Sequence, residues 1–167
     1  MQIIHFFLSL CECKGDLLLA ASSGMAIRFK LDTIPTTGRA TAGVKGIALE
    51  EGDEVRFFEL PKPGDILFVV TDRGVGKRML ADDVERQNRA GKGQKLLPMT
   101  KSGVIGTQLA ACVGATGAAR FVIEQKHGHQ TQLSAAEIPV ERRSGRGTML
   151  VSVLLDDVVT YAGVLAE

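Results

Sequence analysis

The stretch that decides the fold reads Ile66-Leu-Phe-Val-Val-Thr-Asp-Arg-Gly74-Val-Gly-Lys-Arg-Met79. An apolar run leads into a polar turn that ends in glycine, and a second, mixed run follows it. This order is typical of a β-hairpin, because glycine readily adopts the positive φ that a tight turn requires. Residues 66–79 are therefore predicted to form two antiparallel strands joined at Gly74.

The same pattern occurs twice more in the chain. It is centred on Gly24 within Leu17–Phe29 and on Gly128 within Phe121–Leu133, so that successive hairpin glycines are 50 and 54 residues apart. A fixed period of this length indicates a repeat architecture. We expect three structural units and a divergent N-terminal lead. The lead is placed at 1–14 and the units at 15–63, 64–117 and 118–167.

A basic, glycine-rich loop follows each hairpin. The loops read Arg39-Ala-Thr-Ala-Gly43-Val-Lys45-Gly46, Arg89-Ala-Gly91-Lys92-Gly93 and Arg143-Ser-Gly145-Arg146-Gly147. A short strand and then a closing apolar strand are expected after each loop. The expected short strands are Ile47–Leu49, Gln94–Leu97 and Thr148–Val153, and the closing strands are Val55–Leu60, Ile105–Ala111 and Val158–Val164.

Four strands per unit and no convincing amphipathic helix predict an all-β fold. It is an array of about three four-stranded, blade-like repeats, expected to form an arc and no closed ring. Such an arc has two open flanks, and Ile3–Leu10 is expected to pair as a strand over one of them. Leu60-Pro61-Lys62-Pro63-Gly64 and Gly114-Ala115-Thr116-Gly117 are predicted to be the joints between units.

Composition and charge narrow the class of protein. The chain has 167 residues and is 45% apolar, which excludes wholesale disorder. Its net charge of +1 excludes a strongly basic, histone-like protein, but the second unit holds 8 basic and 5 acidic residues. Three cysteines give no disulfide framework and favour a reducing cytoplasm. The apolar run Ile3–Leu8 is too short to span a membrane.

Four stretches carry a resemblance to a known family. They are Ser23-Gly-Met-Ala-Ile-Arg-Phe29, Gly38-Arg-Ala-Thr-Ala-Gly-Val-Lys-Gly-Ile47, Glu51-Gly-Asp-Glu-Val55 and Thr71-Asp-Arg-Gly-Val-Gly-Lys-Arg78. The chain resembles, over about residues 15–165, the C-terminal domain of the A subunit of bacterial type IIA DNA topoisomerases. Both DNA gyrase and topoisomerase IV share these features. Gln87-Asn-Arg-Ala-Gly-Lys-Gly93 is similar to the basic, glycine-rich box of gyrase and departs from it at Asn88 and Ala90.

The resemblance implies a β-pinwheel, usually of six blades, whose outer rim binds and bends DNA. The partners that it implies are double-stranded DNA, the catalytic domains of the topoisomerase A subunit, and the ATPase B subunit, in the bacterial cytoplasm at the nucleoid. Such a domain lacks catalytic residues and assists an ATP-dependent, type II topoisomerase. ATP and Mg²⁺ would belong to other domains or subunits of the holoenzyme, and no membrane is involved.

Clustered basic residues at one phase of a repeat mark an electrostatic footprint for phosphates, and glycines let the backbone approach them. The predicted DNA-binding residues are Arg39, Lys45, Lys77, Arg78, Arg89, Lys92, Lys95, Arg143 and Arg146. The predicted structural loop glycines are Gly24, Gly43, Gly46, Gly74, Gly91, Gly93, Gly128, Gly145 and Gly147. Two alternatives stay open: a protein-interaction propeller fragment with no nucleic-acid role, and a truncated gene product without independent function.

Other candidate sites are set aside. Cys11-Glu-Cys13 supplies two thiols, whereas a structural zinc site takes four ligands at regular spacing. His127-Gly-His129 flanks a hairpin turn. The pairs Asp82-Asp83 and Asp156-Asp157 are interpreted as turn residues. Tyr161 is the only tyrosine and lies outside any catalytic motif, so no metal site and no catalytic residue is predicted in this chain.

Overall fold

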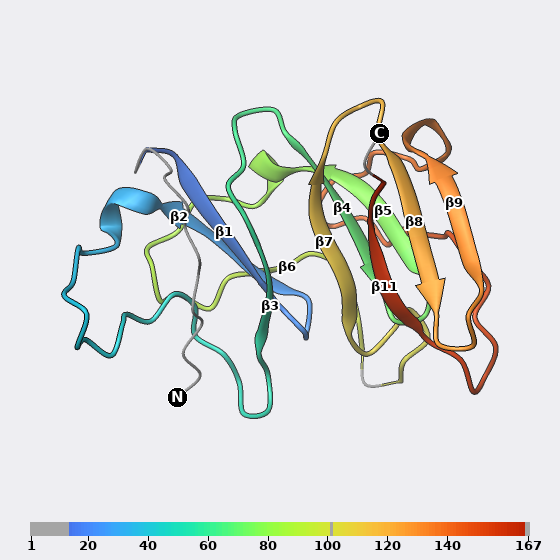
Figure 1. The fold of residues 1–167 in the computed structure, drawn as a ribbon, viewed down its shortest axis with the longest axis horizontal. Helices are drawn as coiled ribbons and strands as arrows, with labels where there is room; N and C mark the ends of the chain where they lie inside the picture. Colours follow the sequence, from blue (N-terminus) through green and yellow to red (C-terminus); the bar gives the residue numbers. More distant parts are fainter. Residues whose placement is uncertain (1–13, 101, 166–167) are drawn as a thin grey trace.

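The computed structural model describes residues 14–100 and 102–165, and its strands form three antiparallel sheets (Figure 1). The predicted strand Ile3–Leu10 lies outside the described residues. Within them, helical structure is confined to three single-turn 3₁₀ segments, and no helix is long and apolar enough to cross a membrane. These segments are η1 (Leu31–Thr33), η2 (Ala81–Asp83) and η3 (Ala135–Glu137). The prediction of an all-β fold is confirmed.

All three predicted hairpins are present. The hairpin glycines Gly24, Gly74 and Gly128 have φ of +81°, +75° and +87°, as a tight turn of this kind requires. The paired strands are β1 (Asp16–Ala21) with β2 (Met25–Lys30), β4 (Ile66–Thr71) with β5 (Val75–Leu80), and β8 (Arg120–Gln125) with β9 (Gln130–Ser134).

One closing strand pairs with the first strand of each hairpin. These strands are β3 (Val55–Glu59) on β1, β7 (Leu109–Ala115) on β4, and β11 (Val159–Val164) on β8. The strand β7 contacts both β3 and β11, and the three run next to one another through the middle of Figure 1. The predicted closing strands are confirmed, except that β7 begins and ends four residues later than Ile105–Ala111. Gly114 and Ala115 therefore lie in a strand and not in a linker.

The fourth strands are exchanged between units. The two-residue strand β6 (Gln94–Lys95) comes from the second unit but pairs with β2, and β10 (Thr148–Met149) comes from the third unit but pairs with β5. We call the sheets blade 1 (β3-β1-β2-β6), blade 2 (β10-β5-β4-β7) and blade 3 (β11-β8-β9). The prediction that each unit builds its own four-stranded sheet is wrong in this respect.

The exchange follows from where the apolar residues after each loop are buried. Leu96 and Leu97 follow β6 and are fully buried, in one core cluster with Leu18 of blade 1 and Leu67 of blade 2. Burying a leucine side chain stabilises the fold by about 1.5–3 kcal/mol. This gain favours a path in which the second unit crosses to blade 1 and pairs with β2. One sequence repeat therefore does not correspond to one sheet, because β6 and β10 each join the sheet of the preceding repeat. Ile47–Leu49 forms no strand.

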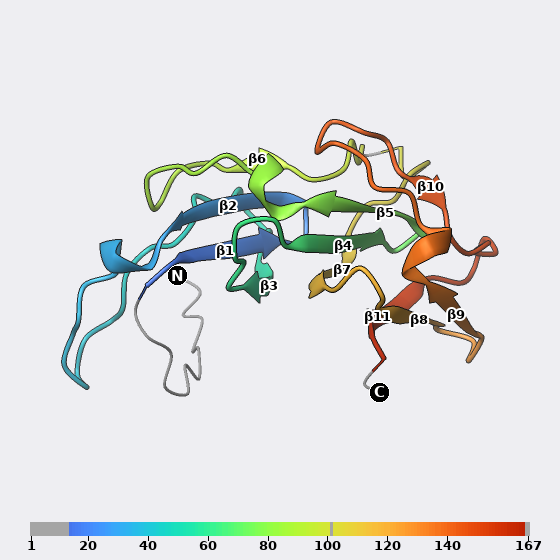
Figure 2. The ribbon, with the colours of Figure 1, turned by 90° about the horizontal axis from the view of Figure 1, so that it is seen from above.

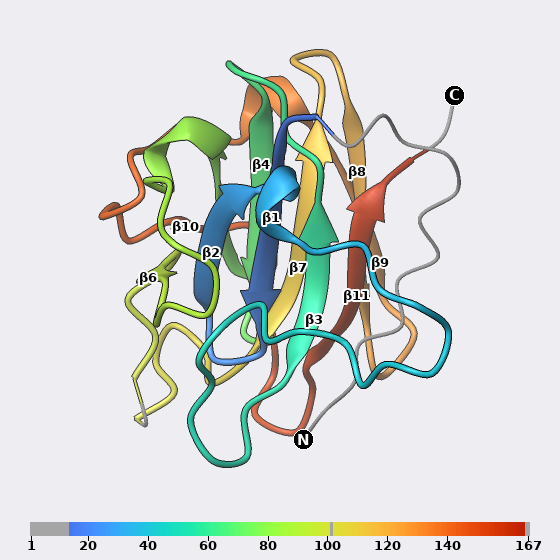
Figure 3. The ribbon, with the colours of Figure 1, turned by 90° about the vertical axis from the view of Figure 1, so that its left-hand side faces the viewer.

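A second apolar cluster joins blades 2 and 3. Phe68 of β4 stacks on Phe121 of β8, with ring centroids 4.0 Å apart. Val151 and Ile123 complete the packing around them. Because the clusters lie between neighbouring blades, the three blades stand in a row, with β6 and β10 along one edge of it (Figure 2). Seen along the row, β6 and β10 lie on the opposite side from β11 (Figure 3).

Candidate nucleic-acid interface

Three loops of the same length share one backbone turn, and the second and third of them precede the exchanged strands β6 and β10. We call residues 37–43, 87–93 and 141–147 rim loops 1, 2 and 3. Each contains the same backbone turn, in which the fifth residue of the loop donates to the carbonyl of the second. The donor and acceptor pairs are Thr41 and Gly38 at 3.2 Å, Gly91 and Asn88 at 3.2 Å, and Gly145 and Arg142 at 2.9 Å.

The last glycine of each rim loop has positive φ. Gly43, Gly93 and Gly147 have φ of +76°, +77° and +76°, and each lies 19 residues after its hairpin glycine. The alignment of the three basic loops by sequence places Gly46 at the position of Gly93. The structure shows that Gly43 is the equivalent residue. The predicted glycines Gly46, Gly91 and Gly145 do not have positive φ, whereas Ala90 does, at +67°.

Rim loops 2 and 3 are closed by a side chain and mounted on the preceding blade. The Gln87 side-chain oxygen accepts from the Gly93 N–H at 3.2 Å, and a Glu141 carboxylate oxygen accepts from the Gly147 N–H at 3.1 Å. The backbone N–H groups of Gln87 and Glu141 donate to the carbonyls of Arg28 and Arg78, both at 2.8 Å. Each loop therefore begins on β2 or β5 and returns to the same blade edge.

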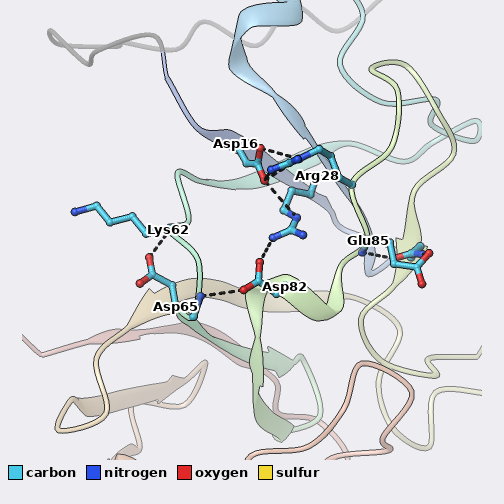
Figure 4. A network of polar contacts seen from close by, with 9 residues as sticks. Asp16, Arg28, Lys62, Asp65, Asp82 and Glu85 are labelled. Carbon is cyan, nitrogen blue, oxygen red and sulfur yellow. Dashed lines mark hydrogen bonds and ion pairs between the residues drawn. The ribbon is translucent and has the colours of Figure 1, made fainter.

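A polar network fixes the base of rim loop 2 (Figure 4). Arg86, the residue before the loop, donates twice to Asp16 of β1, at 3.0 Å through each of two nitrogens. Arg28 pairs with both Asp16 and Asp82, and Asp82 also accepts from the Gly64 N–H at 2.9 Å. The hydrogen bond from Arg28 is the main reason that the pKa of Asp82 is lowered. The network ties both sides of the joint between blades 1 and 2 to one another.

Apart from Arg86, which pairs with Asp16, six cations on or beside the rim loops are exposed. Five of them were predicted, and Arg142 was missed although it lies beside the predicted Arg143. The stretches 34–46, 86–100 and 142–149 hold two, four and three basic residues and no acidic residue. Glu141 opens rim loop 3, where its carboxylate accepts from the Gly147 N–H, so positive charge predominates on the loops. The exposed cations are Arg39, Lys45, Lys92, Lys95, Arg142 and Arg146.

Two of the predicted arginines position the loops. Arg89 is half-buried and donates to the carbonyls of Lys45 at 2.7 Å and Thr33 at 3.3 Å. Arg143 occupies the same turn position in rim loop 3 and donates to the Lys95 carbonyl at 3.1 Å. Each arginine therefore holds its loop against the chain of the preceding unit, and only part of its charge faces solvent.

Lys77 and Arg78 are corrected from predicted phosphate contacts to supports of the rim. Arg78 is half-buried and donates to the Ile138 carbonyl at 2.8 Å. The Lys77 side chain is fully buried, and its ammonium donates to three carbonyls of rim loop 3. The acceptors are Arg142 at 3.0 Å, Arg143 at 2.7 Å and Gly145 at 2.8 Å. Sequence alone could not find this role, because it depends on the loop that the next unit contributes.

Burial makes the stability contribution of Lys77 depend on pH. Desolvation lowers the pKa of Lys77 to about 8 in the folded protein, whereas a lysine in the unfolded chain has a pKa of about 10.4. Between these values the unfolded state holds more protons, so the free energy of unfolding rises with pH. We expect this rise, between pH ~8 and ~10.4, to be absent in Lys77→Met, as measured by urea unfolding at a series of pH values. If the free energy of unfolding rose equally with pH in the parent protein and in Lys77→Met, this expectation would be wrong.

Two further aspartates, Asp53 and Asp157, serve structure. Asp53 accepts from the Ser22 and Ser23 hydroxyls at 2.7 Å and 2.5 Å, and Asp157 accepts from the Val158 N–H at 2.8 Å, so both aspartates organise turns. Among the described residues, no three histidine, cysteine, aspartate or glutamate side chains are grouped to hold a metal ion. Cys11 and Cys13 lie outside those residues.

Three packed blades that exchange strands, with basic rim loops 2 and 3 along one edge, define the chain as a propeller-like, β-pinwheel domain. A family model described as the DNA gyrase C-terminal domain, beta-propeller, matches residues 15–62 and 65–106. The chain belongs to this family. The gyrase A protein of Kosmotoga olearia is 32% identical over 157 residues, and that of Staphylococcus aureus is 31% identical over 156. Both alignments cover 92% of this chain but only 19% and 17% of the relatives, so the chain spans about a fifth of their length.

Solved structures share the fold. The C-terminal domain of DNA topoisomerase IV aligns with a TM-score of 0.82 at 22% identity, over 92% of this chain and 47% of that one. The DNA gyrase A C-terminal domain aligns with a TM-score of 0.78 at 20% identity, over 92% and 51%. The E. coli ParC C-terminal domain aligns with a TM-score of 0.75 at 16% identity, over 93% and 64%. The family and the fold inferred from the sequence are confirmed.

Proposed function

We propose that this chain binds double-stranded DNA through its rim loops without reading base sequence, and that it bends the duplex. The observation that carries the proposal is the group of exposed cations that the strand exchange places along the edges of blades 1 and 2. Lys92 and Lys95 lie at the edge of blade 1, and Arg142 and Arg146 at the edge of blade 2. Ammonium and guanidinium groups neutralise phosphates and release counterions, which supplies sequence-independent affinity.

Bending follows from holding phosphates on more than one blade. A duplex that contacts the loops of neighbouring blades must follow their relative orientation, which the apolar clusters between the blades fix. Bending ~20–30 bp by 40–90° costs on the order of 1–6 kcal/mol. Counterions released at several rim cations offset that cost.

The topological role is part of the same proposal. The bent duplex is presented to the catalytic domains of a gyrase or topoisomerase IV A subunit, and to its ATP-hydrolysing B subunit, in the bacterial cytoplasm. This chain supplies DNA handling and no strand cleavage. ATP and Mg²⁺ act on the other domains and subunits of that assembly.

Salt dependence tests the DNA-binding proposal directly. If the six exposed rim cations each neutralise one phosphate, the logarithm of the association constant falls with the logarithm of the salt concentration at a slope of about −5. Affinity then drops by about three orders of magnitude between ~50 and ~200 mM salt. Fluorescence anisotropy measures this slope for each of two duplexes of unrelated sequence. No binding at low salt, or a strong preference for one duplex, would refute the proposal.

A further inference from the structure

Rim loops 2 and 3 are attached to the rest of the molecule in different ways. In rim loop 2, the Gly91 carbonyl accepts from the backbone N–H of Ala48, in the first unit, at 2.8 Å. Gly145 is the equivalent residue of rim loop 3, and its carbonyl accepts instead from the side-chain ammonium of Lys77. A group that can lose its charge therefore takes the place of a backbone group that cannot.

Two equivalent positions change together between these loops. Lys77 lies three residues after its hairpin glycine, and Ile27 holds the same position in blade 1. The side chain that closes the loop belongs to Glu141 in rim loop 3 and to Gln87 in rim loop 2. A buried cation thus accompanies an anion in blade 2, whereas an apolar side chain accompanies a neutral amide in blade 1. The attachment of rim loop 3 therefore depends on titratable groups at positions where rim loop 2 has none.

The charged form of Lys77 matches its acceptors. An ammonium group has three N–H donors, and the Lys77 ammonium is within 2.7–3.0 Å of three carbonyl oxygens of rim loop 3. A neutral amine has two N–H donors and a lone pair, so one of the three carbonyls loses its donor and faces the lone pair. Lys77 is fully buried, and an unpaired carbonyl in a buried site is costly. Loss of the proton therefore favours movement of the loop away from β5.

Burial and the neighbouring charges place this proton loss close to neutral pH. Desolvation is the main cause that lowers the pKa of Lys77 to about 8. Glu141 of rim loop 3 and Asp83 of η2 favour the charged form, and Arg143 of rim loop 3 opposes it. Val69, the partner of Lys77 on β4, is apolar. Most of the ammonium therefore loses its proton between pH ~7 and ~9, well below the usual lysine pKa of about 10.4.

We propose that Lys77 is a positioning residue for DNA binding, whose charged ammonium holds rim loop 3 in the form that contacts phosphates and whose loss of a proton releases the loop. This role rests on the proposed binding of DNA. The ammonium holds the carbonyls of Arg142 and Gly145, and Arg146 directly follows Gly145. Both exposed arginines of the loop therefore move when it is released. The duplex loses two phosphate contacts at blade 2 and keeps those at the edge of blade 1.

The pH dependence of DNA affinity tests the proposal in the parent protein. Fluorescence anisotropy at ~50 mM salt is expected to show an affinity about tenfold lower at pH ~9 than at pH ~7, because two phosphate contacts are lost. The slope of log affinity against log salt should flatten by about 2 over the same interval. Equal affinity and slope at the two pH values would overturn the proposal and leave the DNA-binding function standing. Absence of binding already at pH ~7 would overturn both.

Two variants with changes on the surface locate the pH effect. Arg142→Ala with Arg146→Ala removes the exposed cations of rim loop 3, so this protein is expected to bind DNA nearly equally at pH ~7 and ~9. Lys92→Ala with Lys95→Ala removes the same number of charges at the edge of blade 1 and is the matched control. It should retain the about tenfold fall in affinity. A fall of equal size in both variants would assign the effect to another group and overturn the proposal.

Lys77→Met tests the residue itself, since it removes the ammonium and leaves an apolar side chain, as at Ile27 in blade 1. We expect an affinity about tenfold below the parental value at pH ~7 and no further fall at pH ~9. Ile27→Met is the control at the equivalent position and should keep the parental pH profile. Circular dichroism verifies that both variants fold, and the surface variants above do not depend on that outcome. A folded Lys77→Met protein with the parental affinity and pH profile would overturn the proposal.

Discussion

Replacing Lys92, Lys95, Arg142 and Arg146 together by alanine weakens binding to duplex DNA by about a hundredfold or more at ~50 mM salt, as the largest functional effect we expect. All four side chains are exposed at the edges of blades 1 and 2. Losing four phosphate contacts also flattens the slope of log affinity against log salt by about 3 to 4. Arg89 and Arg143 are kept, because they donate to backbone carbonyls and their loss would move the loops.

A variant of equal charge separates local contact from net charge. Lys14, Lys30, Lys62 and Lys126 are also exposed but belong to none of the three rim loops, so changing them to alanine removes the same number of charges. We expect this control to bind DNA with nearly the parental affinity and slope. Anisotropy titrations of both variants at several salt concentrations make the comparison. Equal weakening of the two would mean that the rim loops hold no particular DNA path.

Gly93→Val is expected to lower the free energy of unfolding by about 3–5 kcal/mol, the largest effect on stability of any single change considered. Gly93 has φ of +77°, which a β-branched residue adopts only with strain. A Cβ there would also lie 2.4 Å from the Ala26 carbonyl oxygen, at the point where rim loop 2 meets β2. Relieving that clash requires the exchanged strand to move away from blade 1.

Gly43 provides a matched control within the same molecule. It occupies the equivalent loop position with φ of +76°, but nothing lies within 4 Å of its Cβ position. Gly43→Val therefore retains the backbone strain, about 1–3 kcal/mol, without the clash. Urea unfolding measures the loss of stability in both variants. The difference between the two losses gives the cost of the clash with Ala26. Equal losses would show that backbone strain alone accounts for the effect and that the contact between Gly93 and Ala26 is unimportant.

Sequence alone determined the local elements of this fold. The three hairpins are encoded by contiguous apolar runs and by Gly24, Gly74 and Gly128, whose conformational freedom acts on adjacent residues only. The basic loops were likewise found from contiguous residues, and five of the nine predicted cations are exposed on them. Such features need no partner elsewhere in the chain, so their pattern survives in the sequence.

Only the tertiary structure decided which blade each element serves. The loop glycine of the first unit is Gly43 and not the predicted Gly46. Its positive φ shows this, and its spacing of 19 residues from the hairpin glycine agrees with the other two units. Lys77 was predicted to contact DNA, but the structure buries it. Its burial depends on rim loop 3, more than sixty residues away in the sequence, so no local pattern could show it. Strand exchange follows from the packing of Leu96 and Leu97 between blades 1 and 2. This burial depends on residues far apart in the sequence, so a local sequence pattern does not predict it.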